Sequence, residues 1–575
     1  MFKTDSPYIK ELLKCNIEWK PFTRETFEIA IKEDKMLFVH IGNISNTENR
    51  NLAYELFHDE RVVQMLHEHF ICIPVDTEDV PEAYLIGMDL LLINEQKISE
   101  HINIFSLPGI KPVTSFSSLY PDDFLQIATN VATAFTHKRQ KLETAAEYLT
   151  RRLQFSGLVT RKEAPAPIAP KILHAYIRSW SSRFLDKTTK YNRQPYILTA
   201  RNLSFILEYA HTYQVKEYLN YIDETLTHVY YSPMFDPIEG GIFRQATDYT
   251  LKEPTYELSV YENANAMILF TTAYRCFKKR IYKEAAQRIA EFLESSMHIS
   301  GKGFFTYTTL NVNHSESTYY KYSLKELQEN FKQRWESIAI ALGMDLKTPS
   351  GTMQTISNTP HYWNLTHSET ELLLKIRRKR IKELLPDKRV KTGYNCKVAT
   401  AFCILSQISG NYKYRYLATA AKTIDTVLKN KDIDNLTSDL YDYAHLLNSI
   451  LNLYLITRES RYLSLAKKYT SYIFSNHYQS SVGMFTKSPV NKGKTPLKRA
   501  PVIDYNTLSS NSIMAENMLL MNKVAGNDEI YINTFKQQIY NIEPQLVGSG
   551  PFMAGWGTQI LRYLTGFTHL PPDEQ

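Results

Sequence analysis

A proline-rich segment divides the chain into two parts that have different sequence patterns. The segment spans residues 164–170 and reads APAPIAP. Proline lacks a backbone N–H and restricts the residue before it, so a helix cannot continue through such a run. We therefore predict a first domain over residues 1–150, a linker over 151–170 and a second domain over 171–575.

The first part alternates short apolar runs with amphipathic segments. Short, mainly apolar runs lie at 36–41, 70–75 and 102–105, and helical patterns lie at 26–32, 51–69 and 122–137. Short strands that alternate with helices indicate a small α/β sheet domain.

The second part reads as helices throughout and contains a repeated unit. In each unit an apolar helix is followed by a short polar turn and then by a helix that opens with tyrosine, as at Tyr218, Tyr282, Tyr416, Tyr462 and Tyr531. The gap between Tyr282 and Tyr416 is about twice the length of the others and has room for one degenerate unit. About six such hairpins favour a closed (α/α)6 toroid over the alternative, an open superhelical array.

Composition excludes several classes of function. The net charge of +7 is spread over 575 residues and forms no basic stripe of the kind that nucleic acid requires. The five cysteines are scattered, which fits a reducing compartment, and no apolar stretch is long enough for a membrane span or signal peptide. We expect a cytoplasmic protein with no cofactor, no metal, no nucleic-acid partner and no membrane partner.

Ordered motifs along nearly the whole chain resemble one known family, the thioredoxin-domain proteins that include spermatogenesis-associated protein 20. The N-terminal motifs are SPYI at 6–9 and NIEWKPF at 16–22. The later ones are GGIFR at 240–244, PTYELSVYENA at 254–264, LYDYA at 440–444 and SSNS at 509–512. This resemblance implies a thioredoxin-like domain followed by an (α/α)6 toroid of the six-hairpin glycosidase type.

The chain departs from that family at its redox motif. The family's two cysteine positions correspond here to Asn46 and Asn49, and the proline that lies beside the redox site corresponds to His101. Thiol–disulfide exchange needs a thiolate, and asparagine has no such chemistry. We therefore expect no oxidoreductase activity and interpret Asn46 as a helix cap.

Candidate chemistry concentrates in the predicted toroid. The candidate catalytic carboxylates are Glu257, Asp442 and Asp504, because paired acids on inward-facing helix ends can act on a sugar as acid and base. The candidate substrate-binding residues are Arg244, Asp248, Tyr261, Glu262, Asn263, Asp387, Lys388, Tyr394, Asn395 and Tyr443. The plainer interpretation is that these side chains cap helices and join hairpins.

Two functions follow from these patterns. One is a carbohydrate-binding or carbohydrate-processing toroid, an epimerase or a hydrolase, with a redox-inactive thioredoxin-like domain kept for packing or docking. The other is a non-catalytic scaffold that has drifted from an enzyme and binds a protein partner. Positions at which the chain has lost a residue of the family favour the second function. One example is Thr255, which stands where the family has a histidine.

Overall fold

The computed structural model divides into two compact units. It describes residues 2–45, 47–156, 159–163, 167–185, 195–311, 316–361, 365–429, 439–487, 489, 500–504 and 507–566. The first unit comprises Met1–Leu158, Thr308–Glu316 and Leu385–Arg389, and the second comprises Val159–Tyr307, Ser317–Leu384 and Val390–Gln575. The predicted linker contains residues 164–166, which lie outside the described residues.

A four-stranded sheet organises the first unit. Its strands are β1 (Met36–Gly42), β2 (Phe70–Asp76), β3 (Ile102–Leu107) and β4 (Lys111–Phe116), in the order β2-β1-β3-β4. The central strand β1 is parallel to β2 and antiparallel to β3, with Val39 paired to both Ile73 and Ile104. This order and these directions are those of a thioredoxin-like sheet, as the sequence predicted.

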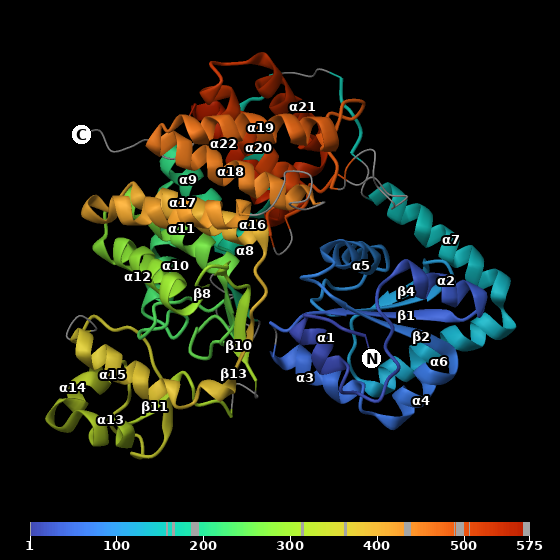
Figure 1. Cartoon of the computed structure of the whole chain (residues 1–575), viewed down its shortest axis with the longest axis horizontal. Helices are drawn as coiled ribbons and strands as arrows, with labels where there is room; N and C mark the ends of the chain where they lie inside the picture. The colour runs from blue at the N-terminus through green and yellow to red at the C-terminus, as the bar shows by residue number, and fades with distance from the viewer. Residues whose placement is uncertain are drawn as a thin grey trace. The chain divides into compact units, whose positions relative to one another are not determined.

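Helices pack around this sheet and complete its core (Figure 1). They are α1 (Pro7–Leu12), α2 (Arg24–Lys32), α3 (Thr47–Leu56), α4 (Glu60–His69), α5 (Pro81–Ile93), α6 (Pro121–His137) and α7 (Arg139–Ser156). Aromatic rings fill the space between strands and helices, with Phe38 5.3 Å from both Phe105 and Phe124. The strands are buried along nearly their whole length, because helices cover the sheet.

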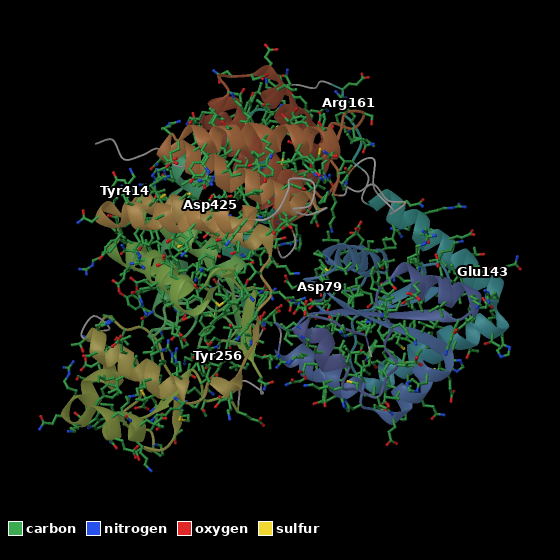
Figure 2. The ribbon with its side chains drawn as sticks, viewed as in Figure 1. Asp79, Glu143, Arg161, Tyr256, Tyr414 and Asp425 are labelled. Atoms are coloured by element: carbon green, nitrogen blue, oxygen red, sulfur yellow. The ribbon has the colours of Figure 1, made fainter. Side chains whose placement is uncertain are left out.

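Two short segments from later in the sequence belong to the first unit. In the segment 308–316, the Leu310 carbonyl accepts a hydrogen bond of 2.7 Å from Arg50 Nη2. In the segment 385–389, Arg389 pairs with the buried Asp76 at 2.7 Å and with Asp79, which is labelled in Figure 2, at 2.6 Å. Buried ion pairs of this kind fix the position of a segment strongly. The first unit is therefore discontinuous in sequence.

The second unit is a closed ring of helices. Within its described residues, each inner helix packs against the next and the last packs against the first. The inner helices are, in order, α9 (Ala200–Tyr213), α11 (Val260–Phe277), α16 (Thr392–Ser406), α18 (Leu440–Thr457), α20 (Ser510–Val524) and α22 (Ala554–Thr565). This closure confirms the predicted (α/α)6 toroid and rules out the open array.

One outer helix covers each inner helix. The outer helices are α8 (Pro170–Leu185), α10 (Lys216–Tyr230), α12 (Arg280–Ser296), α17 (Lys413–Leu428), α19 (Ser460–His477) and α21 (Glu529–Leu546). Their buried residues recur at helical spacing, as at Tyr282, Ala286, Ile289 and Leu293 of α12, whereas α16 is buried almost all round. The repeated tyrosines of the sequence all lie on outer helices.

The long gap in the tyrosine repeat does not hold a ring hairpin. It contains a helical insertion with its own apolar core, formed by α13 (Leu324–Phe331), α14 (Trp335–Ala341) and α15 (His367–Arg378). Arg377 of α15 is fully buried and pairs with Asp236 of the ring unit at 2.5 Å. The sixth pair is instead formed by the two ends of the ring unit, because the outer helix α8, which lacks the tyrosine signal, packs against the last inner helix α22.

Candidate functional site

The first turns of the inner helices meet at one end of the ring. Gly393 N of α16 donates to Asp442 Oδ1 of α18 at 2.7 Å, and Gly555 N of α22 donates to Asp504 Oδ2 at 2.9 Å. Tyr261 Oη of α11 accepts from Leu508 N, just before α20, at 3.2 Å. The starts of these helices are therefore held close together, and further along the inner helices charged side chains form one polar group.

That group, which we call the central cluster, takes charged or polar side chains from every described inner helix. Its members are Arg201 and Glu208 on α9, Glu262 on α11, Lys397 on α16, His445 on α18, Glu516 on α20, and Gln559 and Arg562 on α22. Charges in the middle of helices that are otherwise buried and apolar are expensive unless they are paired or functional.

The pKa of Lys397 differs strongly from that of an ordinary lysine. Desolvation lowers its pKa to about 8, while the negative charges of Glu516 and Glu262 work in the opposite direction. Its side chain is nonetheless partly exposed. A lysine with this pKa is neutral in a useful fraction of molecules near neutral pH, so it can accept a proton or act as a nucleophile.

The pKa of Glu262 is shifted in the opposite direction, upwards. Desolvation raises the pKa of its carboxyl, and the positive charges of Arg201 and Arg244 offset part of that effect. Its side chain is also partly exposed. Burial therefore favours the neutral form of Glu262, as it does the neutral form of Lys397.

A network of ion pairs joins three other members of the cluster. Arg562 donates to both oxygens of Glu208, at 2.8 and 3.1 Å, and to Glu516 Oε1 at 2.9 Å. These three side chains are largely buried, with exposures of 8 to 14%. Arg562 is paired on two sides, and neither Lys397 nor Glu262 takes part in these ion pairs.

Aromatic side chains line the same helix ends. The Tyr261 ring lies 5.1 Å from that of Tyr394, and the Tyr441 ring lies 4.6 Å from that of His445. Tyr394 and Tyr441 keep partial exposure, while Tyr261 and His445 are buried. Flat rings that carry hydroxyl groups suit a ligand with both apolar faces and polar edges.

The candidate aspartates act as caps in this structure. Asp442 Oδ1 accepts from the first turn of α16. Asp504 accepts from Ser509 N at 2.7 Å as well as from Gly555 N, and desolvation raises its pKa. Glu257 is fully buried, 3.6 Å from Arg244 Nη1. These positions fit the plainer structural interpretation, and their catalytic role stays a prediction.

Two candidate asparagines hold the connections between hairpins. Asn263 Oδ1 accepts from Ile242 N at 2.9 Å, and Asn395 Oδ1 accepts from Phe304 N at 2.8 Å, in equivalent places on α11 and α16. Tyr443 is buried against the Tyr472 ring, 5.0 Å away. All three side chains are committed to packing within the ring unit.

The other candidates lie apart from the central cluster. Asp248 accepts from Thr250 N at 2.8 Å in an exposed turn. Asp387 and the exposed Lys388 belong to the first compact unit, where Asp387 binds Arg389 at 2.5 Å. Of the predicted binding residues, Arg244, Tyr261, Glu262 and Tyr394 therefore lie in or beside the cluster, Arg244 because its charge acts on Glu262.

Sequence reasoning missed Arg201, Lys397, Glu516 and Arg562. A usable signal was present, because Lys397 and Arg562 are each the only charged residue of an apolar helix. A helix that is apolar all round is buried, so a lone charge within it calls for a partner or a ligand. Which lone charges meet in space depends on the closure of the ring.

The region that corresponds to the family's redox site holds a buried hydrogen-bond network, which we call the histidine network. Tyr8 Oη lies 2.7 Å from His40 Nε2 and 3.2 Å from His101 Nδ1, and His40 Nδ1 lies 2.7 Å from Asn103 Oδ1. Desolvation lowers the pKa of both histidines to about 3, so both rings are neutral at ordinary pH. A Cβ on Gly42 would lie 2.4 Å from Tyr8 Oη, so glycine is required there.

The start of α3, where a redox motif would lie, is covered by the segment 308–310 of the same unit. Thr309 Oγ1 lies 3.1 Å from Thr47 Oγ1 and donates to the Ser45 carbonyl at 3.1 Å. Asn46 and the Asn49 side chain lie outside the described residues, so the predicted cap is not assessed. Cys15 and Cys72, the cysteines of this unit, are buried, and desolvation raises the pKa of both thiols.

No helix within the described ranges is both long enough and apolar enough to cross a bilayer. Those ranges also hold no group of three or more His, Cys, Asp and Glu side chains arranged to bind a metal ion.

Residues 1–154 match the model of the family Thioredox_DsbH, described as "Protein of unknown function, DUF255". Mouse spermatogenesis-associated protein 20 is 21% identical over 56% of this chain, and the match spans 43% of that protein. The rat protein of the same name is 19% identical over 91% of this chain and 75% of its own length.

A sugar epimerase from a ruminal bacterium is similar in structure, with 11% identity, coverage of 69% of this chain and 98% of that chain, and a TM-score of 0.46. The toroid assignment itself rests on the contacts among this chain's own helices. Together with the ordered motifs, these sequence matches support the resemblance of the chain, which lacks the C-x-x-C motif, to the thioredoxin-domain proteins that include spermatogenesis-associated protein 20.

Proposed function

We propose that the ring unit binds a small polyhydroxylated ligand, a sugar, at the central cluster and performs acid–base chemistry on it. The first unit then serves as a redox-inactive packing or docking module. The observation that carries this proposal is Lys397: it is partly exposed, its pKa is lowered to about 8, and no hydrogen bond or ion pair engages its ammonium group among the described residues.

The surroundings of Lys397 favour a sugar over an anionic ligand. Three positive side chains, Arg201, Lys397 and Arg562, are balanced in the cluster by three negative ones, Glu208, Glu262 and Glu516. A balanced site offers no net attraction to a phosphate group. Donors, acceptors and partly exposed tyrosine rings together suit the hydroxyl groups and apolar faces of a sugar ring.

The pair of Lys397 and Glu262 favours proton transfer at carbon over hydrolysis. An amine that is partly neutral can remove a proton from the carbon beside a carbonyl, and a protonated carboxyl can stabilise the developing oxyanion. Epimerisation and isomerisation of sugars need these two steps. A hydrolase of the usual kind needs two carboxylates across the bond, and Asp442 and Asp504 are engaged by helix ends.

The scaffold function has one observation in its favour. The Arg562 network ties together Glu208 and Glu516, and such networks can hold a ring closed without any ligand. Tyr256, labelled in Figure 2, is likewise buried in a stack 5.0 Å from Tyr320. A scaffold does not explain why Lys397 keeps accessible surface and remains outside that network.

A binding screen separates the two functions. We expect at least one monosaccharide or disaccharide to raise the melting temperature of the wild-type protein, because a ligand at 100 times its Kd stabilises by about 2.7 kcal/mol. Lys397→Met and Glu262→Gln should each abolish that shift, whereas Lys523→Met, an exposed lysine on α20, should leave it unchanged. Absence of any shift across the panel would support the scaffold.

The reaction type can be tested with the sugar that binds. In D2O, an epimerase or isomerase of this kind exchanges the hydrogen on the carbon beside the carbonyl, which NMR detects directly. Glu262→Gln should slow this exchange at least tenfold. Release of free monosaccharide from a disaccharide without exchange would instead indicate hydrolysis.

A further inference from the structure

A second cavity lies in the ring unit, apart from the central cluster. Its volume is about 540 Å³, within the range of small-molecule sites. It is bounded by the end of α8, the start of α9, the exposed side of α10, and the residues Tyr249, Leu251 and Pro551. Among its described lining residues there is no member of the central cluster, so the two sites can be tested independently.

Aromatic rings form the walls of this cavity. The Phe184 ring lies 5.1 Å from Tyr221 and 5.4 Å from Trp180, and the Tyr196 ring lies 5.4 Å from Tyr249. The floor between them is aliphatic, with Leu203, Ile206 and Val229 among its residues. Rings arranged in this way enclose a flat apolar group.

Two buried polar atoms in the lining have no hydrogen-bond partner among the described residues. They are Trp180 Nε1, a donor on a side chain 4% exposed, and Asn202 Oδ1, an acceptor on a residue 8% exposed. An unsatisfied buried polar atom costs about 1–3 kcal/mol, and most such atoms in folded proteins are paired. Each of these two atoms has less than 1 Å² of accessible surface, so a ligand with one acceptor and one donor satisfies both only when the Trp180 and Asn202 side chains turn towards the cavity.

The rim of the cavity is acidic, although the protein as a whole carries a net charge of +7. Among the described lining residues, the exposed carboxylates of Glu217 and Glu224 lie on α10, and the exposed Arg183 carries the opposite charge, with the exposed His228 also in the lining. Acidic groups above aromatic walls attract an organic cation, because the ring faces and the carboxylates both favour positive charge.

We propose that this cavity binds a small aromatic amine that also carries an amide. The ring fills the aromatic walls, and the ammonium group faces Glu217 and Glu224. The amide carbonyl accepts from Trp180 Nε1, and an N–H of the ligand donates to Asn202 Oδ1. Each part of this ligand matches one feature of the described lining. These features are the aromatic rings, the two carboxylates, the unpaired donor and the unpaired acceptor.

The test uses phenylalanine amide as the probe, titrated into the full chain by isothermal calorimetry. We expect saturable binding, at least tenfold weaker binding of the neutral N-acetylphenylalanine amide, and no binding of alaninamide or of the anionic N-acetylphenylalanine. These four probes vary the ring and the charge one at a time.

Variants locate the binding. The double variant Glu217→Gln, Glu224→Gln changes only exposed residues and should weaken the binding of phenylalanine amide at least fivefold. Asn202→Leu and Trp180→Phe should each weaken it to a similar extent, with the melting temperature as a check on folding. Glu336→Gln, an exposed glutamate on α14, should have no effect. Lys397→Met should also have no effect, because it alters the other site.

The proposal is overturned if phenylalanine amide gives no saturable heat up to millimolar concentration. It is equally overturned if N-acetylphenylalanine binds as tightly as the amine, or if the rim variants bind as tightly as the wild type.

Discussion

The histidine network of the first unit and the central cluster of the ring are both polar groups inside apolar surroundings, but they are organised in opposite ways. In the histidine network the side chains bind one another, and desolvation keeps His40 and His101 neutral. In the central cluster Lys397 and Glu262 keep accessible surface and shifted pKa values.

The difference indicates where chemistry remains in this chain. The side chains of the histidine network are buried and hydrogen-bond one another, although His101 Nε2 has no partner among the described residues. A group that is desolvated but still accessible to a ligand can use its altered pKa in binding or catalysis. We therefore propose that the first unit serves a structural role, whereas the ring keeps a reactive centre.

The largest expected effect comes from breaking the structural half of the central cluster. Arg562→Met leaves Glu208 and Glu516 without their cation and should lower the free energy of unfolding of the ring by about 3–5 kcal/mol. Arg461→Met, which removes an exposed pair with Asp425, should cost less than about 1 kcal/mol. Urea unfolding of both variants measures the contrast, and equal losses would contradict the assignment.

Lys397→Met should instead raise the free energy of unfolding. The pKa of Lys397 is lowered from 10.5 to about 8 in the folded protein, so between these values the unfolded chain binds more protons and the stability rises with pH. Below pH 8 the folded state bears the full penalty, about 3 kcal/mol. The variant should therefore be more stable than the wild type at pH 7, and this advantage should shrink towards pH 10.5. A constant difference across that range would contradict the prediction.

Tyr8→Phe tests the histidine network. The variant removes the hydroxyl that contacts His40 and His101 and leaves buried nitrogen atoms unsatisfied, which should cost about 1–3 kcal/mol. Tyr54→Phe, at an exposed tyrosine of the same unit, serves as the matched control and should change stability little. If both variants unfold at the same temperature, the network contributes nothing.

The smallest expected effect concerns redox activity. Restoring the motif with Asn46→Cys and Asn49→Cys should give no detectable acceleration of the reduction of insulin by dithiothreitol. The segment 308–310 covers the start of α3, and His101 occupies the proline position beside it. Turnover above the wild-type background would show that the site is still open.

Much of the fold could be predicted from local patterns. The strands β1, β2 and β3 appear as apolar runs, and the outer helices appear through their tyrosines, because both signals depend on neighbouring residues alone. The insertion α13–α15 was not predicted, since its length matches that of a missing hairpin. The incorporation of residues 385–389 into the first unit depends on Arg389 meeting Asp76 and Asp79, which are distant in sequence.

The site was harder to predict than the fold. Glu262 and Tyr261 were found because they lie within one motif, whereas Lys397 and Arg201 lie on different helices and meet only when the ring closes. Asp442 and Asp504 attracted attention as acids, but each lies where a helix begins and accepts its N–H groups. Capping and catalysis use the same residue types, so sequence alone does not separate them.

Competitive labelling of lysines with acetic anhydride, read by mass spectrometry as a function of pH, tests the central claim most directly. The account predicts that Lys397 is labelled in the folded protein with an apparent pKa near 8, well below that of the exposed Lys523, and that a bound sugar protects it. A Lys397 that resists labelling at every pH, or that titrates together with Lys523, would contradict the existence of a reactive centre in the ring.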